Sequence, residues 1–207
     1  MKKKYNKGFS LIEIVVVLAI MGVIAAFLTP MLFNYLSESK LRRAQADART
    51  IAAAIGQFNT DTGLYPIYSL LPANNTNATV KVLVTDGNDA VEGSAGAWNT
   101  GAAGVRSTLE NPLHIGVLTD GSTLYNSASG VKKPNEWRGP YMSDFKADSW
   151  GNKYYVSTEG MKTGVAKAAF VLSAGPDGLI QTVLSQNVGT GTVAFLVGGD
   201  DIVQRIK

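Results

Sequence analysis

The fold is decided by Lys7-Gly8-Phe9-Ser10-Leu11-Ile12-Glu13 and by the uncharged run Ile14–Phe33 that follows it. The run has 20 residues, so as a helix rising roughly 1.5 Å per residue it would be about 30 Å long. The hydrocarbon core of a bilayer is also about 30 Å thick. Lysines at positions 2, 3, 4 and 7 precede the run, and basic residues favour the cytoplasmic side of a membrane. The sequence therefore predicts one membrane-spanning helix whose N-terminal end is cytoplasmic.

The helical pattern continues beyond the apolar run. Apolar residues recur at spacings of three and four, which is typical of a helix face that packs on a core. They are Leu41, Ala44, Ala48, Ile51, Ile55 and Phe58. Gly63 suits the left-handed position that follows a helix, and Pro66 cannot continue one. We expect one helix from Phe9 to about Asp61, loosened at Gly22 and Pro30, whose second half packs on its own domain.

Strand signals dominate the C-terminal third of the chain. Lys153–Thr158, Ala168–Ser173 and Thr192–Val197 are rich in β-branched or aromatic residues and lie between glycines. Lys81–Thr85 is a further short strand candidate, and Val105–Asn111 has the pattern of a helical turn. We therefore predict an α+β fold, in which a small antiparallel sheet lies on the second half of the long helix.

The N-terminal motif resembles the processing site of type IV pilins and of the pseudopilins of type II secretion. In that family a peptidase cuts after the glycine, here Gly8, and the new N-terminal residue, here Phe9, is methylated on its amine. The family also has a glutamate at the fifth mature position, here Glu13, and often a proline at position 22, here Pro30. The resemblance implies that Glu13 and Pro30 serve assembly into a filament.

A second set of motifs resembles the major pseudopilin of type II secretion systems. These motifs are Tyr65-Pro66, Gly139-Pro140-Tyr141, Asp148-x-Trp150-Gly151-Asn152-x-Tyr154 and Ser173-Ala174-Gly175-Pro176-Asp177-Gly178. Ser149 stands where the family usually has proline. The segments between Pro66 and Gly139 and between Asp177 and Asp200 are far longer than in the family pattern.

The resemblance also implies a division of the chain. Residues 1–8 would be a cleaved basic leader, residues 9–36 the transmembrane and polymerisation helix, and residues 37–207 a periplasmic pilin-like domain. Within that domain, residues 67–136 have the composition of a long variable loop region, rich in Asn, Thr, Ala and Gly. The precursor would be a single-pass protein of the inner membrane.

The function implied is structural. The processed chain would polymerise by helix packing into a pseudopilus that drives protein export. Its partners would be further copies of itself, minor pseudopilins, a prepilin peptidase, and an inner-membrane platform with its ATPase. A surface type IV pilus is the near alternative: the missing Cys pair favours a pseudopilin, whereas long insertions would suit a longer surface fibre. A non-polymerising, membrane-anchored ligand-binding protein is the alternative from another class.

Glu13 places a charge at the edge of the apolar run. A carboxylate at mid-bilayer costs on the order of 2.5–3.5 kcal/mol, and less near the edge. In the dry core of a filament it would need a cation or would become protonated. Cleavage creates such a cation, the amine of Phe9 in a neighbouring subunit. Because a buried ion pair roughly breaks even in energy, this pair would set axial register more than stability. The alternative is that Glu13 only reaches the lipid headgroups.

Three late aspartates suggest a calcium site. Asp177 lies in an Asp-Gly turn, and the run around Asp200 and Asp201 could fold back beside it. Ca²⁺ binds several oxygens, from carboxylates and backbone carbonyls. The resemblance implies backbone ligands near the first turn, here Leu172 and Ser173. Ordinary Asp-Gly turn chemistry is the alternative.

Charge and composition exclude other classes. The formal net charge is +3, but four of the 19 basic residues lie in Met1–Gly8, so removal of the leader leaves 15 basic against 16 acidic residues, or −1. We therefore expect no nucleic-acid partner. The chain has no Cys, which excludes disulfides and thiol catalysis, and His114 is its single His. We expect no enzymatic activity.

Overall fold

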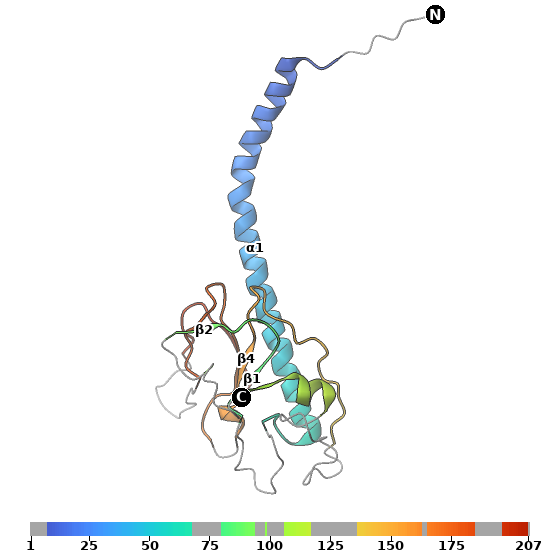
Figure 1. Ribbon diagram of the computed structural model, residues 1–207, viewed down its shortest axis with the longest axis vertical. Coiled ribbons are helices and arrows are strands. Elements are labelled where there is room, and N and C mark those ends of the chain that lie inside the picture. Colours follow the sequence, from blue (N-terminus) through green and yellow to red (C-terminus); the bar gives the residue numbers. More distant parts are fainter. Residues whose placement is uncertain are drawn as a thin grey trace, which may run out of the picture. The chain divides into compact units, whose positions relative to one another are not determined.

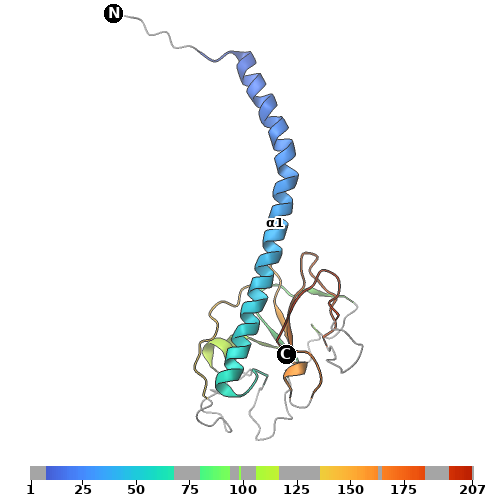
Figure 2. The same ribbon diagram turned by 180° about the vertical axis from the view of Figure 1, so that it is seen from behind.

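The computed structural model describes residues 8–67, 80–93, 98, 106–116, 136–162, 165–184 and 196–206. The chain divides into two compact units, Met1–Lys40 and Leu41–Lys207. Helix α1 (Leu11–Thr62) contributes residues to both units. Figures 1 and 2 show this helix. The predicted long helix is therefore confirmed.

In the first unit α1 is helical throughout, including Gly22 and Pro30. Pro30 has no N–H, so it cannot donate to the carbonyl of Ala26 one turn earlier. The neighbouring Thr29 hydroxyl donates to the carbonyl of Ala25 at 2.7 Å. Among the described residues, α1 is the one helix long and apolar enough to cross a membrane, and its most apolar window is entirely exposed.

In the second unit one face of α1 enters the core. The buried positions are Ala44, Ala48, Ile51, Ala54, Ile55, Phe58 and Thr62. They include every residue of the predicted stripe except Leu41, which is 37% exposed, so its placement in the core was wrong. Ala54 and Thr62 are buried as well and were not part of the predicted stripe. Leu41 is the first residue of this unit, before the helix meets the core at Ala44. Gly63 has a φ of 71° and its N–H donates to the carbonyl of Asn59 at 2.9 Å, so it ends the helix as predicted.

The main sheet has five strands in the order β3-β1-β4-β5-β7. Their bounds are β1 (Val82–Val84), β3 (Arg106–Thr108), β4 (Tyr155–Ser157), β5 (Phe170–Ser173) and β7 (Ile202–Arg205). β4 is antiparallel to both β1 and β5, and β5 is antiparallel to β7. β1 and β3 are parallel, so the sheet is mixed rather than purely antiparallel.

One local prediction was wrong, and a second is contradicted in the two residues of it that the structure describes. The predicted helical turn at Val105–Asn111 contains strand β3, and the helical turn η1 (Asn111–Ile115) comes only afterwards. Residues 106–108 are a strand because they pair with β1. The hydrogen bond from the Leu109 N–H to the Val84 carbonyl at 3.0 Å extends this pairing by one residue. Of the predicted strand Thr192–Val197, residues 192–195 lie outside the described residues, and Leu196 and Val197 belong to no strand. The last strand is the more polar β7, which pairs with β5.

The three central strands of the sheet, β1, β4 and β5, are buried on both faces. Leu83, Val156 and Val171 share one face and pack with α1 residues such as Ile51 and Phe58. Val82, Tyr155 and Phe170 belong to a second core with Trp98, Ile180 and Leu184. Beside this second core lies a two-stranded parallel sheet of β2 (Val91–Glu92) and β6 (Leu179–Ile180). A short 3₁₀ turn, η3 (Glu159–Met161), follows β4. The sequence predicted the first core only, because the second is built from short segments without long periodicity.

Candidate processing, assembly and cation sites

The N-terminal motif lies at the start of α1. Gly8, Phe9 and Ser10 precede the helix, and Phe9 is 79% exposed. The Ser10 carbonyl accepts hydrogen bonds from the N–H groups of Glu13 at 3.1 Å and Ile14 at 3.3 Å, which makes Ser10 the N-cap residue. A side chain at Gly8 would meet nothing within 4 Å. No contact of the described chain therefore accounts for a glycine at this position.

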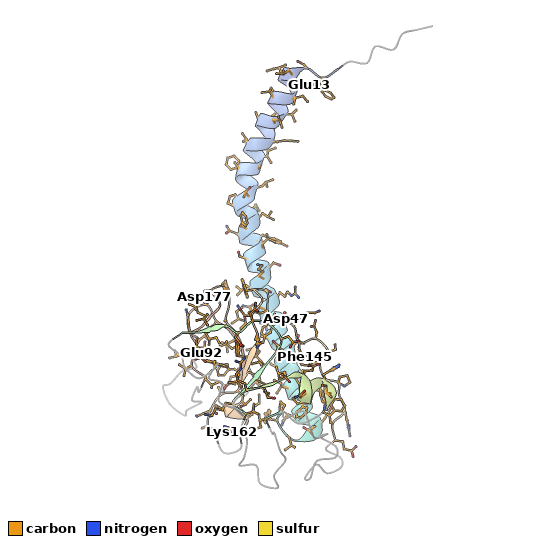
Figure 3. The ribbon with its side chains drawn as sticks, in the orientation of Figure 1. Glu13, Asp47, Glu92, Phe145, Lys162 and Asp177 are labelled. Carbon is orange, nitrogen blue, oxygen red and sulfur yellow. The ribbon has the colours of Figure 1, made fainter. Side chains whose placement is uncertain are left out.

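Glu13 lies in the first turn of α1 and is exposed (Figure 3). The first N–H groups of a helix have no partner within the helix, and they give its N-terminus a partial positive charge. This charge favours a carboxylate in the first turn. The side chains that follow, from Ile14 to Phe33, form an exposed uncharged surface on every side of the helix.

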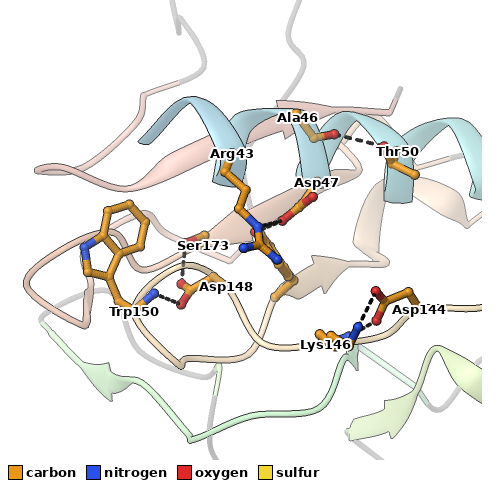
Figure 4. Close-up of polar contacts among 10 residues, drawn as sticks. Arg43, Ala46, Asp47, Thr50, Asp144, Lys146, Asp148, Trp150 and Ser173 are labelled. Carbon is orange, nitrogen blue, oxygen red and sulfur yellow. Dashed lines mark hydrogen bonds and ion pairs between the residues drawn. The ribbon is translucent and has the colours of Figure 1, made fainter. Parts of the chain in front are cut away.

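The Asp148 turn joins two of the sequence motifs (Figure 4). Asp148 is buried; its Oδ1 accepts the N–H groups of Trp150 at 2.9 Å and Asn152 at 2.8 Å. Its Oδ2 accepts the hydroxyl of Ser173 at 2.6 Å. The carboxylate therefore holds this turn in a chain that has Ser149 in place of the usual proline.

The turns that carry the three late aspartates lie side by side. The Asp177 N–H donates to Asp200 Oδ2 at 3.4 Å. Gly175 has a φ of 67°, and a Cβ added there would lie 2.5 Å from the Asp200 carbonyl oxygen. A residue with a side chain would therefore force the two turns apart. Asp177 and Asp200 are exposed, so their carboxylates lie at the surface of this cluster.

Asp201 differs from the other two because it is 7% exposed. Its Oδ2 accepts the N–H groups of Gln181 at 2.9 Å and Thr182 at 2.6 Å. Its Oδ1 is buried and has no hydrogen-bond partner among the described residues. Burial raises the pKa of the Asp201 carboxyl, which the hydrogen bonds from residues 181 and 182 oppose. A buried carboxylate oxygen without a partner is costly unless a proton or a cation compensates it.

The donor set of this cluster is all oxygen, which suits a hard cation such as Ca²⁺. In the described ranges no three His, Cys, Asp or Glu side chains gather closely enough to hold a metal, so a cation here would also need backbone carbonyls. Leu172 and Ser173, the predicted backbone ligands, lie in β5 opposite Val203 and Ile202. The Ser173 hydroxyl is engaged by Asp148.

Two residues at this site were missed by sequence reasoning. The indole N–H of Trp98 donates to the Thr182 carbonyl at 2.8 Å, and both side chains are fully buried. Neither residue belongs to a sequence motif or to a periodic apolar run, so no local signal pointed to this bond. His114, the single His of the chain, is exposed; its ring lies edge-on to Phe145 with 6.2 Å between centroids, and its Nδ1 lies 3.2 Å from the Met142 carbonyl oxygen.

Two family models match the chain. Residues 3–29 match the prokaryotic N-terminal methylation motif, and residues 121–188 match protein G of the type II secretion system. No solved structure matches the chain significantly.

Curated relatives fall into two groups. The type II secretion system core protein G of Pseudomonas aeruginosa is 36% identical over 66 residues, which cover 32% of this chain and 46% of that relative. The protein of the same name from Escherichia coli is 26% identical over 177 residues, 86% of each chain. Fimbrial protein EcpC of Eikenella corrodens is 31% identical over 110 residues, 52% of this chain and 68% of the relative. The match with the Pseudomonas protein thus spans about half of that relative's length.

Proposed function

Because this chain belongs to the family of type IV pilin-like proteins, which includes fimbrial proteins and type II secretion core proteins G, we propose that it is the major structural subunit of a secretion pseudopilus. A prepilin peptidase would cut after Gly8, and the amine of Phe9 would be methylated. The processed chains would polymerise through the first halves of their α1 helices. The subunit would act mechanically, without catalysis of its own.

The observation that carries this proposal is the exposed surface of α1 from Ile14 to Phe33. A helix that is apolar all round is stable in a membrane or among other helices, but not in water. In the precursor this apolar segment would span the inner membrane, with the leader lysines in the cytoplasm and the C-terminal domain in the periplasm. Assembly would transfer the same surface from lipid to the centre of a helix bundle.

Glu13 supports a directed assembly rather than simple aggregation. Uniform apolar packing gives neighbouring helices no preferred axial register, whereas an ion pair between one carboxylate and one amine does. The amine would be that of Phe9 in the neighbouring subunit, two residues before the helix begins at Leu11. Minor pseudopilins would share this packing, and an inner-membrane platform with its ATPase would supply the work of insertion.

The decisive experiment is the intact mass and N-terminal sequence of the protein from membranes of its own host. A chain that begins at methylated Phe9 supports the proposal. Glu13→Gln should then be cut normally but should not form filaments, because the amide removes the charge while keeping the shape. A chain that retains Met1 in cells with active peptidase would contradict the proposal and favour the anchored, non-polymerising protein.

A surface pilus is the second candidate, and the coverage of the Eikenella fimbrial protein favours it. Electron microscopy of intact cells distinguishes the two. Long fibres beyond the outer surface would support a pilus. Loss of protein export after deletion, without such fibres, would support a pseudopilus.

We also propose that the cluster of Asp177, Asp200 and Asp201 binds calcium. The buried Oδ1 of Asp201 and the adjacent turns of Asp177 and Asp200 support this assignment. Calcium would neutralise the carboxylates and join the last strand to the turn after β5. Calcium should raise the melting temperature of the detergent-solubilised protein relative to EDTA, and Asp177→Asn with Asp200→Asn should abolish that rise. An equal melting temperature with and without calcium would exclude the site.

A further inference from the structure

Thr182 is the centre of a small buried network in the second core. Its N–H donates to Asp201 Oδ2 at 2.6 Å, its carbonyl accepts the Trp98 indole N–H at 2.8 Å, and its hydroxyl oxygen accepts the Gly198 N–H at 3.0 Å. All three of its polar groups are therefore engaged. The bonds reach two segments of the chain: residue 98, and the turn that contains residues 198 and 201.

Trp98 makes this centre rigid. Its ring packs edge-on against Tyr155 at 5.9 Å and Phe170 at 5.7 Å between centroids, so two strands of the main sheet fix its position. A fully buried indole in such contacts has little freedom to move. Because the Trp98 indole donates to the Thr182 carbonyl, it fixes the position of Thr182 relative to the main sheet.

The bond between Thr182 and Gly198 then fixes the start of the turn that carries the aspartates. The Asp201 N–H donates back to the Gly198 carbonyl at 3.2 Å, so residues 198–201 form one closed turn. Gly198 lies so close to Gln181 that an added Cβ would collide with its backbone. The position of Asp200 beside Asp177 therefore depends on Thr182.

We propose that Trp98 and Thr182 form a positioning clamp, which sets the affinity of the Asp177, Asp200 and Asp201 cluster for a divalent cation. This inference rests on the calcium site proposed above. Asp201 Oδ2 accepts the backbone N–H groups of Gln181 and Thr182. The carboxylates of Asp177 and Asp200 are exposed at the surface. Trp98 and Thr182 act by placement, as residues behind the ligands of metal sites commonly do. Their link to the cation site is the hydrogen bond from the Thr182 N–H to Asp201 Oδ2, which leaves Asp201 Oδ1 for the cation.

Two substitutions test the clamp in the full-length protein in detergent. Thr182→Val keeps the side-chain shape but loses the hydroxyl acceptor, and Trp98→Phe keeps an aromatic ring but loses the indole donor. Each has a matched control: Thr60→Val removes an exposed hydroxyl that bonds the Gly56 carbonyl, and Trp137→Phe removes an indole bond to the Pro112 carbonyl in the other core.

Calcium affinity is measured by calorimetric titration with CaCl₂, and melting temperatures are measured in EDTA and in calcium. We expect both clamp variants to bind calcium about 10- to 100-fold more weakly than the wild type. Both controls should keep wild-type affinity, even where Trp137→Phe lowers the melting temperature in EDTA. The rise in melting temperature caused by calcium should shrink only in the clamp variants.

Clamp variants that bind calcium with wild-type affinity would overturn the inference, whatever their melting temperatures in EDTA. So would controls that lose as much affinity as the clamp variants, because the effect would then follow from general destabilisation. A wild type that binds no calcium would overturn both the cation site and this inference. It would not affect the proposed pseudopilin role, which rests on the apolar surface of α1.

Discussion

At the scale of the residue, Asp148 shows how one buried carboxylate organises a turn. Its two oxygens accept three hydrogen bonds, from the backbone at Trp150 and Asn152 and from the Ser173 hydroxyl. The sequence motif located the turn, but the bond to Ser173 joins positions 25 residues apart and depends on the sheet. Such a pairing has no local signal in the sequence.

Replacement of Asp148 by Ala should therefore destabilise the domain strongly. The change leaves two backbone N–H groups and a buried hydroxyl without partners, which we expect to lower the free energy of unfolding by about 2–4 kcal/mol. Urea unfolding, followed by tryptophan fluorescence, measures it. Asp144→Ala is the control, because the Asp144–Lys146 ion pair is exposed and should contribute little. A loss at Asp144 equal to that at Asp148 would contradict the argument.

The ion pairs of Asp89 should make the stability of the domain depend on pH. Hydrogen bonds and charge from Arg106 at 2.6 Å and Lys153 at 2.9 Å hold the pKa of Asp89 below its ordinary value of 3.8. A carboxyl whose pKa is lower in the folded state stabilises the fold at pH above 3.8 and loses this contribution as the pH falls through the lowered pKa. The wild type should thus be more stable than Asp89→Asn at pH 6, and the difference should vanish at strongly acidic pH. A difference independent of pH would show that the ion pairs are not its source.

At the scale of the element, periodicity predicted the parts that are long or apolar. The spacing of Ala44, Ala48, Ile51, Ile55 and Phe58 identified the core face of α1 because a helix repeats this spacing over several turns. β1, β4 and β5 were found because every residue in them is buried and most of these residues are β-branched, aromatic or Leu. β3 and β7 were missed because each is short, partly polar and fixed by its neighbour in the sheet.

The helix face offers a direct test of this packing. Ile55→Ala should lower the free energy of unfolding by about 2–4 kcal/mol, since Ile55 is fully buried and the change leaves a cavity. Leu41→Ala should cost under about 1 kcal/mol, because Leu41 lies at the exposed start of the same stripe. Chemical denaturation in detergent measures both. Equal losses at the two positions would contradict the assignment of the core face.

At the scale of the whole molecule, residues 1–8 and the rest of the chain carry opposite charge. The complete chain has a net charge of +3 and an isoelectric point of about 9.0. Four lysines lie before Gly8, so the remainder has 15 basic and 16 acidic side chains. The excess of positive charge therefore lies in residues 1–8, before the proposed cleavage site.

Processing should therefore invert the charge of the protein. We expect the isoelectric point to fall from about 9 to below about 7 when the leader is removed. Isoelectric focusing of membrane protein from cells with and without the peptidase measures the shift. A Gly8→Val variant should remain basic, because a branched side chain in place of glycine would block cleavage. An acidic band from this variant would place the cut elsewhere.

The contact between Trp98 and Thr182 also has a consequence for how the two long segments evolve. Trp98 lies in the long segment between Pro66 and Gly139, and Thr182 lies in the long segment between Asp177 and Asp200. Each segment would leave a buried polar group without its partner if the other were lost. Deletion of either one alone should therefore be selected against, and the two segments should be gained and lost together among the relatives of this chain.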